Sequence, residues 1–79
     1  MRVRLRFFAA LREEMGSTGK RTVAPGTTVA VLWRSLVDEH PELAAVPVRF
    51  AVNEEYVPPS HALADGDEVA FFPPVSGGL

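Results

Sequence analysis

The sequence contains no cysteine. Disulfide bonds, thiolate-ligated zinc and cysteine nucleophiles are therefore excluded, and the composition suits a reducing cytosol. The sequence also has no apolar run near the ~20 residues that span a bilayer, and its start lacks the uninterrupted hydrophobic segment of a secretory signal. We therefore expect a cytoplasmic protein with no membrane partner.

Net charge is also small, with a formal value of -2 at pH 7. Such a balance provides no general attraction to phosphate backbones, so nucleic acid is not an expected partner. The basic residues are scattered, apart from Arg2, Arg4, Arg6 and the pair Lys20-Arg21. A chain of 79 residues has room for one domain with one hydrophobic core.

The first half of the chain predicts a strand, a short helix, a second strand and a long helix. Basic and apolar residues alternate over 2–8, which is typical of an edge or half-buried strand whose outward arginines keep it soluble. Strong helix formers at 9–15 precede Gly16, a typical helix end. Residues 16–20 have the composition of a turn, and 20–26 predict the second strand.

The main helix begins after Thr27 or Thr28, either of which can cap it. Its apolar residues recur at the spacing of one buried helical face, at Val29, Leu32, Trp33, Leu36 and Val37. Trp33 is interpreted as a core anchor, since a lone Trp on an apolar stripe usually packs inside. The helix ends at His40-Pro41, because a residue before proline avoids the helical region.

The second half predicts short strands. Residues 48–52 alternate, 53–56 supply a reversal into a short strand at 56–57, and 68–72 form the last strand. With too few helices to cover both sheet faces, we predict a two-layer α+β domain whose mixed sheet wraps around one main helix, a ubiquitin-like roll. The domain should span 1–73, followed by an extended tail at 74–79.

Side-chain chemistry is sparse. His40 and His61 are interpreted as surface residues, and the adjacent pairs Glu13-Glu14 and Glu54-Glu55 point in different directions. Asp65 and Asp67 flank Gly66, which indicates a turn rather than a metal site. No phosphate loop, zinc motif or nucleophile-base set is present, so we expect no metal, no bound cofactor and no catalytic pocket.

The last residues, FFPPVSGGL, carry the clearest functional signal. Pro73 and Pro74 stiffen the exit from the strand, while Gly77 and Gly78 make the thinnest chain a protein can offer. From Pro74 to Gly78 an extended chain reaches roughly 17 Å, enough to enter another protein's active site. A diglycine carboxylate is ionised at neutral pH and resists nucleophilic attack until an activating enzyme converts it into an acyl donor.

The sequence resembles the small subunit of molybdopterin synthase, the MoaD-like branch of the ubiquitin-like sulfur carriers. The resemblance covers the chain in order and is carried by FFAALREEMG, TTVAVLWRSL, AVNEEYV and above all LADGDEVAFFPPVSGG. It implies a β-grasp fold and a carrier without catalytic side chains. It also implies three partners: a MoeB-like enzyme that uses ATP to adenylate the terminal glycine, a sulfurtransferase, and a MoaE-like large catalytic subunit that receives the tail.

By the same resemblance, Gly78 becomes the acyl adenylate and then the thiocarboxylate that donates sulfur to a cyclic pyranopterin precursor. Pro74, Val75, Ser76 and Gly77 form the inserted segment. The family's chains usually end at the second glycine, whereas Leu79 follows here, so we expect a peptidase to remove it. The alternatives are an adenylating partner that tolerates leucine, or a homologue that has lost carrier activity. In the last strand Val69 and Phe71 should face the core, leaving Phe72, with Phe8 of the first strand, for a partner interface.

Other functions remain open at this point. The chain could carry sulfur in thiamine thiazole, cysteine or transfer-RNA thiolation, or act as a ubiquitin-like protein modifier, because each uses the same tail chemistry. It could also be a plain interaction domain whose terminal glycines have no role. Removal of the diglycine separates this last hypothesis from the others.

Overall fold

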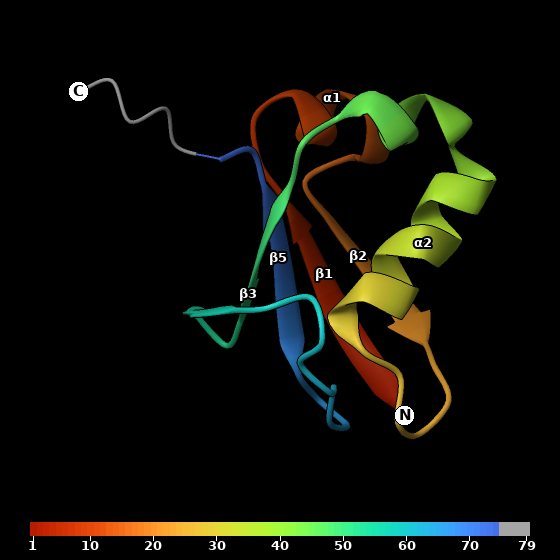
Figure 1. Cartoon of the computed structure of the whole chain (residues 1–79), viewed down its shortest axis with the longest axis vertical. Coiled ribbons are helices and arrows are strands. Elements are labelled where there is room, and N and C mark those ends of the chain that lie inside the picture. Colours follow the sequence, from red (N-terminus) through yellow and green to blue (C-terminus); the bar gives the residue numbers. More distant parts are fainter. Residues whose placement is uncertain (75–79) are drawn as a thin grey trace.

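The computed structural model describes residues 1–74 of the chain. Its elements, in order, are β1 (Arg2–Phe7), α1 (Ala10–Met15), β2 (Thr18–Thr22), α2 (Val29–Glu39), a 3-10 helix η1 (Pro41–Ala45), β3 (Arg49–Val52), β4 (Glu55–Val57) and β5 (Glu68–Phe72). The strands form one sheet in the order β2-β1-β5-β3-β4, and α2 lies on one side of it (Figure 1). The sheet is mixed, since β1 and β5 run parallel while the other neighbours run antiparallel. The predicted two-layer α+β architecture is confirmed.

The core lies between α2 and the inner face of the sheet. Alternation along the two central strands places every second side chain there, and Phe71 of β5 is fully buried. Its ring lies 5.4 Å from that of Phe7, 5.3 Å from Trp33 and 5.8 Å from Phe50, measured between centroids. Trp33 therefore packs against the core, as predicted from the helical stripe.

Helix α2 begins and ends where its sequence predicts. The Thr28 side chain accepts a hydrogen bond from the Val31 backbone N–H at 3.2 Å, which satisfies one of the free donors of the first turn. Val29, Leu32 and Leu36 form the buried face. The helix ends at His40, and the unpredicted η1 begins at Pro41, a residue common in the first turn of a helix.

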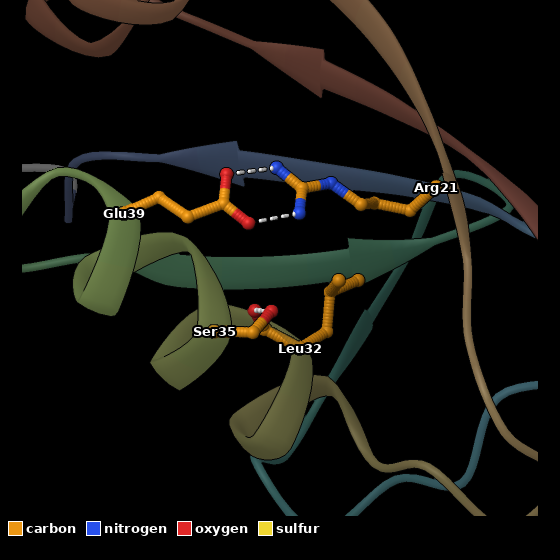
Figure 2. Close-up of polar contacts among 4 residues, drawn as sticks. All are labelled: Arg21, Leu32, Ser35 and Glu39. Carbon is orange, nitrogen blue, oxygen red and sulfur yellow. Dashed lines mark hydrogen bonds and ion pairs between the residues drawn. The ribbon is translucent and has the colours of Figure 1, made fainter.

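An ion pair joins the edge strand β2 to the C-terminal end of α2 (Figure 2). Arg21 donates from Nη1 to Oε2 of Glu39 at 2.5 Å and from Nη2 to Oε1 at 2.7 Å. This two-point geometry suits the planar guanidinium. The hydrogen bonds from Arg21 hold the pKa of the Glu39 carboxyl below its usual value. One turn earlier, the Ser35 hydroxyl donates to the Leu32 carbonyl at 2.7 Å.

The strand at 2–8 was expected to be an edge strand or a half-buried one, and the second alternative holds. β1 pairs with β2 on one side and with β5 on the other, and its side chains alternate between buried and exposed. The second strand was expected at 20–26, after a turn, but β2 includes Thr18 and Gly19 and ends at Thr22. Its bounds follow the register with β1, which runs from Arg2 opposite Thr22 to Arg6 opposite Thr18. Pairing with a neighbour thus overrides the local turn composition.

The hairpin between β3 and β4 is tighter than predicted. The reversal uses only Asn53 and Glu54, whose φ angles are +51° and +70°, as in the two-residue turns that match strand twist. Strand β4 therefore begins at Glu55, which was expected within the reversal, and includes Tyr56 and Val57 as predicted. Strand β3 starts at Arg49 instead of residue 48, whereas β5 has the predicted bounds.

Leu36→Ala should lower the free energy of unfolding by about 2–5 kcal/mol, because it opens a cavity in a buried layer. Urea denaturation measures the change. Val31→Ala is the control, since Val31 lies on the same helix but is 57% exposed, and it should change stability by no more than about 0.5 kcal/mol. Equal destabilisation by both variants would contradict the assigned core.

The Arg21–Glu39 pair should stabilise the fold in a pH-dependent way. Because the pKa of Glu39 is lowered in the folded state, its contribution is full above the unfolded-state pKa and disappears as the pH falls through the folded-state pKa. Melting temperatures of the wild type and Glu39→Gln should therefore differ at neutral pH and converge in acid. Asp38→Asn, an exposed neighbour on α2, serves as the control. A difference that persists undiminished in acid would refute the pair's role.

Candidate functional site

The candidate site is the exit from β5. Phe71 points into the core, and Phe72 lies on the opposite face of the sheet, half-buried. Pro73 is exposed and Pro74 is half-buried. The predicted orientation of Phe72 is therefore confirmed, and the chain leaves the last core residue directly on the face that α2 does not cover.

Phe72 and Pro74 line an open groove of about 750 Å³. The groove also includes the start of β3 and the residues after β4, among them Pro47, Arg49, Tyr56, Pro58 and Pro59. Tyr56 is 78% exposed, and its ring centroid lies 5.5 Å from that of Phe72. We call Tyr56 and Phe72 the aromatic patch. An exposed and a half-buried aromatic ring beside an apolar groove are typical of a protein interface.

Sequence reasoning placed Tyr56 at the start of the short strand at 56–57 but did not name it as a site residue. In the structure Tyr56 of β4 lies opposite Ala51 of β3, and Ala51 lies opposite Ala70 of β5. Two small residues therefore lie between Tyr56 and strand β1. Once the hairpin is known to turn at Asn53 and Glu54, alternation alone would place Tyr56 on the outer face.

Phe8, the second predicted interface residue, lies beside the same exit. Phe7 is buried, whereas Phe8 is 36% exposed, so one of the two phenylalanines turns outward as expected. The Phe8 backbone N–H donates to the Phe71 carbonyl at 3.2 Å, and the Arg6 guanidinium lies 5.2 Å from the Phe8 ring centroid. The chain then turns sharply at Ala9, whose φ of +55° is unfavourable for a residue with a Cβ.

The remaining predicted site residues lie outside the described part of the chain. These are Val75, Ser76 and Gly77 of the insertion segment, Gly78 as the acyl position, and Leu79. Of the predicted tail, the structure describes Pro74 alone. The predicted boundary between domain and tail therefore stays a prediction.

The Asp65-Gly66-Asp67 segment is a turn, as predicted. Gly66 has a φ of +85°. The Asp67 carboxylate accepts hydrogen bonds from the Asn53 side chain at 3.0 Å and the Ala64 N–H at 2.8 Å, while Asp65 accepts from the Arg2 N–H at 2.7 Å. These bonds tie the start of β5 to its two neighbouring strands. Within residues 1–74, no group of three or more acidic or histidine side chains is arranged to hold a metal ion.

Other titratable residues do not gather at the groove. Glu14 and Glu42 lie near each other on the helical side, where a hydrogen bond and repulsion from Glu42 raise the pKa of Glu14. Glu42 has a lowered pKa through a hydrogen bond from its own backbone and one from Glu14. His40 Nδ1 lies 3.7 Å from Glu42, and the His61 N–H donates to the Pro58 carbonyl. The groove lining contains neither histidine.

The described residues also include no helix long and apolar enough to cross a membrane.

Comparison with protein families matches residues 5–78 to the ThiS family. The chain belongs to the ThiS family. This ThiS-family chain is 38% identical to the molybdopterin synthase sulfur carrier subunit of Escherichia coli (strain K12) over 80 residues, which cover 96% of this chain and 99% of the relative. It is 39% identical over 83 residues to the molybdopterin synthase sulfur carrier subunit of Chlamydomonas reinhardtii. The match covers 99% of this chain and 100% of the relative. The resemblance stated from the motifs is confirmed.

Solved structures agree with the ThiS-family assignment. Small archaeal modifier protein 1 of H. volcanii has a TM-score of 0.80 and 33% identity, with 94% of this chain and 98% of that chain covered. A complex of subunits 1 and 2 of molybdopterin-converting factor from Helicobacter pylori includes a chain with a TM-score of 0.69 and 26% identity. The match covers 99% of this chain and 100% of that chain. The ubiquitin-like β-grasp fold is thus confirmed.

Proposed function

We propose that this protein is the sulfur-carrier small subunit of molybdopterin synthase in molybdenum cofactor biosynthesis. The observation that carries the proposal is the exit of β5, where Phe71 completes the core and Phe72 begins an apolar groove. In the sequence the diglycine Gly77-Gly78 follows this exit. Relatives of nearly full length and 38 to 39% identity are sulfur carrier subunits of this enzyme, which supports it.

The proposed chemistry takes place at the carboxyl group of Gly78. An activating partner joins this carboxylate to the α-phosphate of ATP, releasing pyrophosphate. Hydrosulfide then displaces AMP from the acyl carbon and loses its proton to leave a thiocarboxylate. The protein itself holds no permanent cofactor and contributes no catalytic side chain. In the given sequence the Gly78 carbonyl is an amide to Leu79, which cannot be adenylated, so removal of Leu79 must come first.

Residues 1–73 act in this proposal as a handle and 74–79 as the reactive arm. The handle docks through Phe8 and the aromatic patch, while Pro74, Val75, Ser76 and Gly77 enter the acceptor's active site. The acceptor is a large catalytic subunit, and the complex of two converting-factor subunits from Helicobacter pylori supports a partner of that kind. An adenylating enzyme and a sulfurtransferase act earlier, in the cytoplasm.

A second function, attachment to other proteins, is favoured by the similarity to small archaeal modifier protein 1. The same activated Gly78 would then react with a lysine amine instead of a sulfur nucleophile. The two functions leave different products. Sulfur transfer yields the dithiolene of molybdopterin, whereas conjugation yields an amide between Gly78 and a lysine that mass spectrometry of cell extracts detects.

Tyr56→Ala should weaken binding to the large subunit by at least about tenfold, because exposed aromatic residues often dominate interface energies. Isothermal titration calorimetry measures the affinity. Since Tyr56 is 78% exposed, the melting temperature should stay close to that of the wild type. Val31→Ala, on the helical side, is the control for loss of an exposed apolar residue. Equal affinities of the two variants would exclude the aromatic patch from the interface.

A chain ending at Gly78 should gain the mass difference between sulfur and oxygen when incubated with the activating enzyme, ATP and a sulfur donor. Intact-mass spectrometry detects this change. A chain ending at Ser76 is the control and should gain no sulfur and support no dithiolene formation. The proposal is wrong if the Ser76-terminated chain sustains normal cofactor synthesis, or if the Gly78-terminated chain remains unmodified under all these conditions.

A further inference from the structure

The arginines of β1 lie at the centre of the sheet, which changes their interpretation. Outward charges on an edge strand prevent aggregation, but β1 has a neighbour on both sides and exposes no free strand edge. Arg4 lies directly opposite Lys20 of β2, and Arg2 and Arg6 lie one pleat to either side on the same outer face. We call Arg2, Arg4, Arg6 and Lys20 the basic patch.

The fold concentrates positive charge on this outer face. Five of the eight basic residues lie on its strands, and Glu68 is the single acidic residue that the strand register places there. The strand residues of this face therefore carry a net charge of +4, whereas the other residues of the chain sum to -6. The five basic residues are Arg2, Arg4, Arg6, Lys20 and Arg49.

This arrangement is unfavourable for the isolated fold. Like charges directly opposite each other on neighbouring strands, as at Arg4 and Lys20, are destabilising. Two carboxylates offset part of this charge: Glu68 lies opposite Arg4 and 3.6 Å from Arg6, and Asp65 accepts a hydrogen bond from the Arg2 backbone N–H at 2.7 Å. Both side chains of the Arg6–Glu68 pair are partly exposed, so solvent screens it. The cations surround an open depression of about 350 Å³. An acidic partner would relieve this repulsion.

The basic patch is continuous with the aromatic patch. One cross-strand row runs from Arg6 to Ala70, Ala51 and Tyr56, so only two methyl side chains lie between the cations and the tyrosine. Three strand spacings separate Arg6 from Tyr56, a distance of roughly 14 Å. A partner that covers the aromatic patch therefore reaches the basic patch without moving any large side chain.

We propose that the basic patch is a docking surface for an acidic segment of the large subunit that accepts the tail, and that it accelerates their encounter. This inference rests on the proposed function. The cations repeat every ~7 Å along β1, which suits an extended acidic chain. A compact phosphate fits less well, because the backbone N–H groups of β1 already serve the pairing with its neighbours.

The test compares Arg4→Glu/Lys20→Glu with Arg12→Glu/Arg34→Glu in stopped-flow association with the cognate large subunit. Both double variants change the net charge equally, but Arg12 and Arg34 are exposed on the helices. At low ionic strength the patch variant should associate at least about tenfold more slowly than the wild type, and the helix variant should stay within about twofold. The difference in association rate between the patch variant and the wild type should vanish at high salt. Melting temperatures verify that both variants fold.

Equal slowing by both variants would indicate a general effect of net charge and would overturn the inference, as would no slowing in either. Binding of a single-stranded oligonucleotide that only the patch variant loses, with unchanged association with the large subunit, would assign the patch to nucleic acid and also overturn it. The proposed function is tested separately by Tyr56→Ala. If Tyr56→Ala weakens binding and the patch variant associates normally, the docking inference alone fails.

Discussion

The parallel pairing of β1 with β5 is the contact on which the rest of the structure depends. It places Phe7 beside Phe71 under α2 and makes β5 the central strand of the sheet. The strand that closes the core is therefore the strand that leads to the tail. Because side chains alternate at every residue, burial of Phe71 requires Phe72 to face outward. The stability of the domain and the position of the proposed reactive arm thus follow from one register.

The same alternation divides the sheet into two faces with different roles. The inner face is apolar and packs against α2, while the outer face carries the basic patch, two alanines and the aromatic patch in one continuous surface. A protein this small has no pocket chemistry of its own in its described residues. In the proposed function the protein presents one activated carbonyl group, and the uncovered face and the tail are the proposed recognition elements.

Much of this could be predicted from the sequence where the signal is local. The stripe from Val29 to Leu36, the cap at Thr28 and the bounds of β5 agree with the structure, because each depends on residues within one or two turns or pleats. Predictions failed where distant pairing decided the outcome. Thr18 and Gly19 have turn composition but join β2 because β1 offers them partners, and Glu55 belongs to β4 because Asn53 and Glu54 complete the turn alone.

The sequence by itself determined the helical stripe, the alternation of the last strand and the diglycine motif, since periodicity and residue type are properties of neighbouring residues. It also determined membership of the ThiS family, which its motifs carry. Only the tertiary structure decided that β1 has a neighbour on both sides, that Tyr56 lies against Phe72, and that four cations from two strands form one patch. These facts depend on strand order and register, which join residues far apart along the chain and leave no local pattern in it.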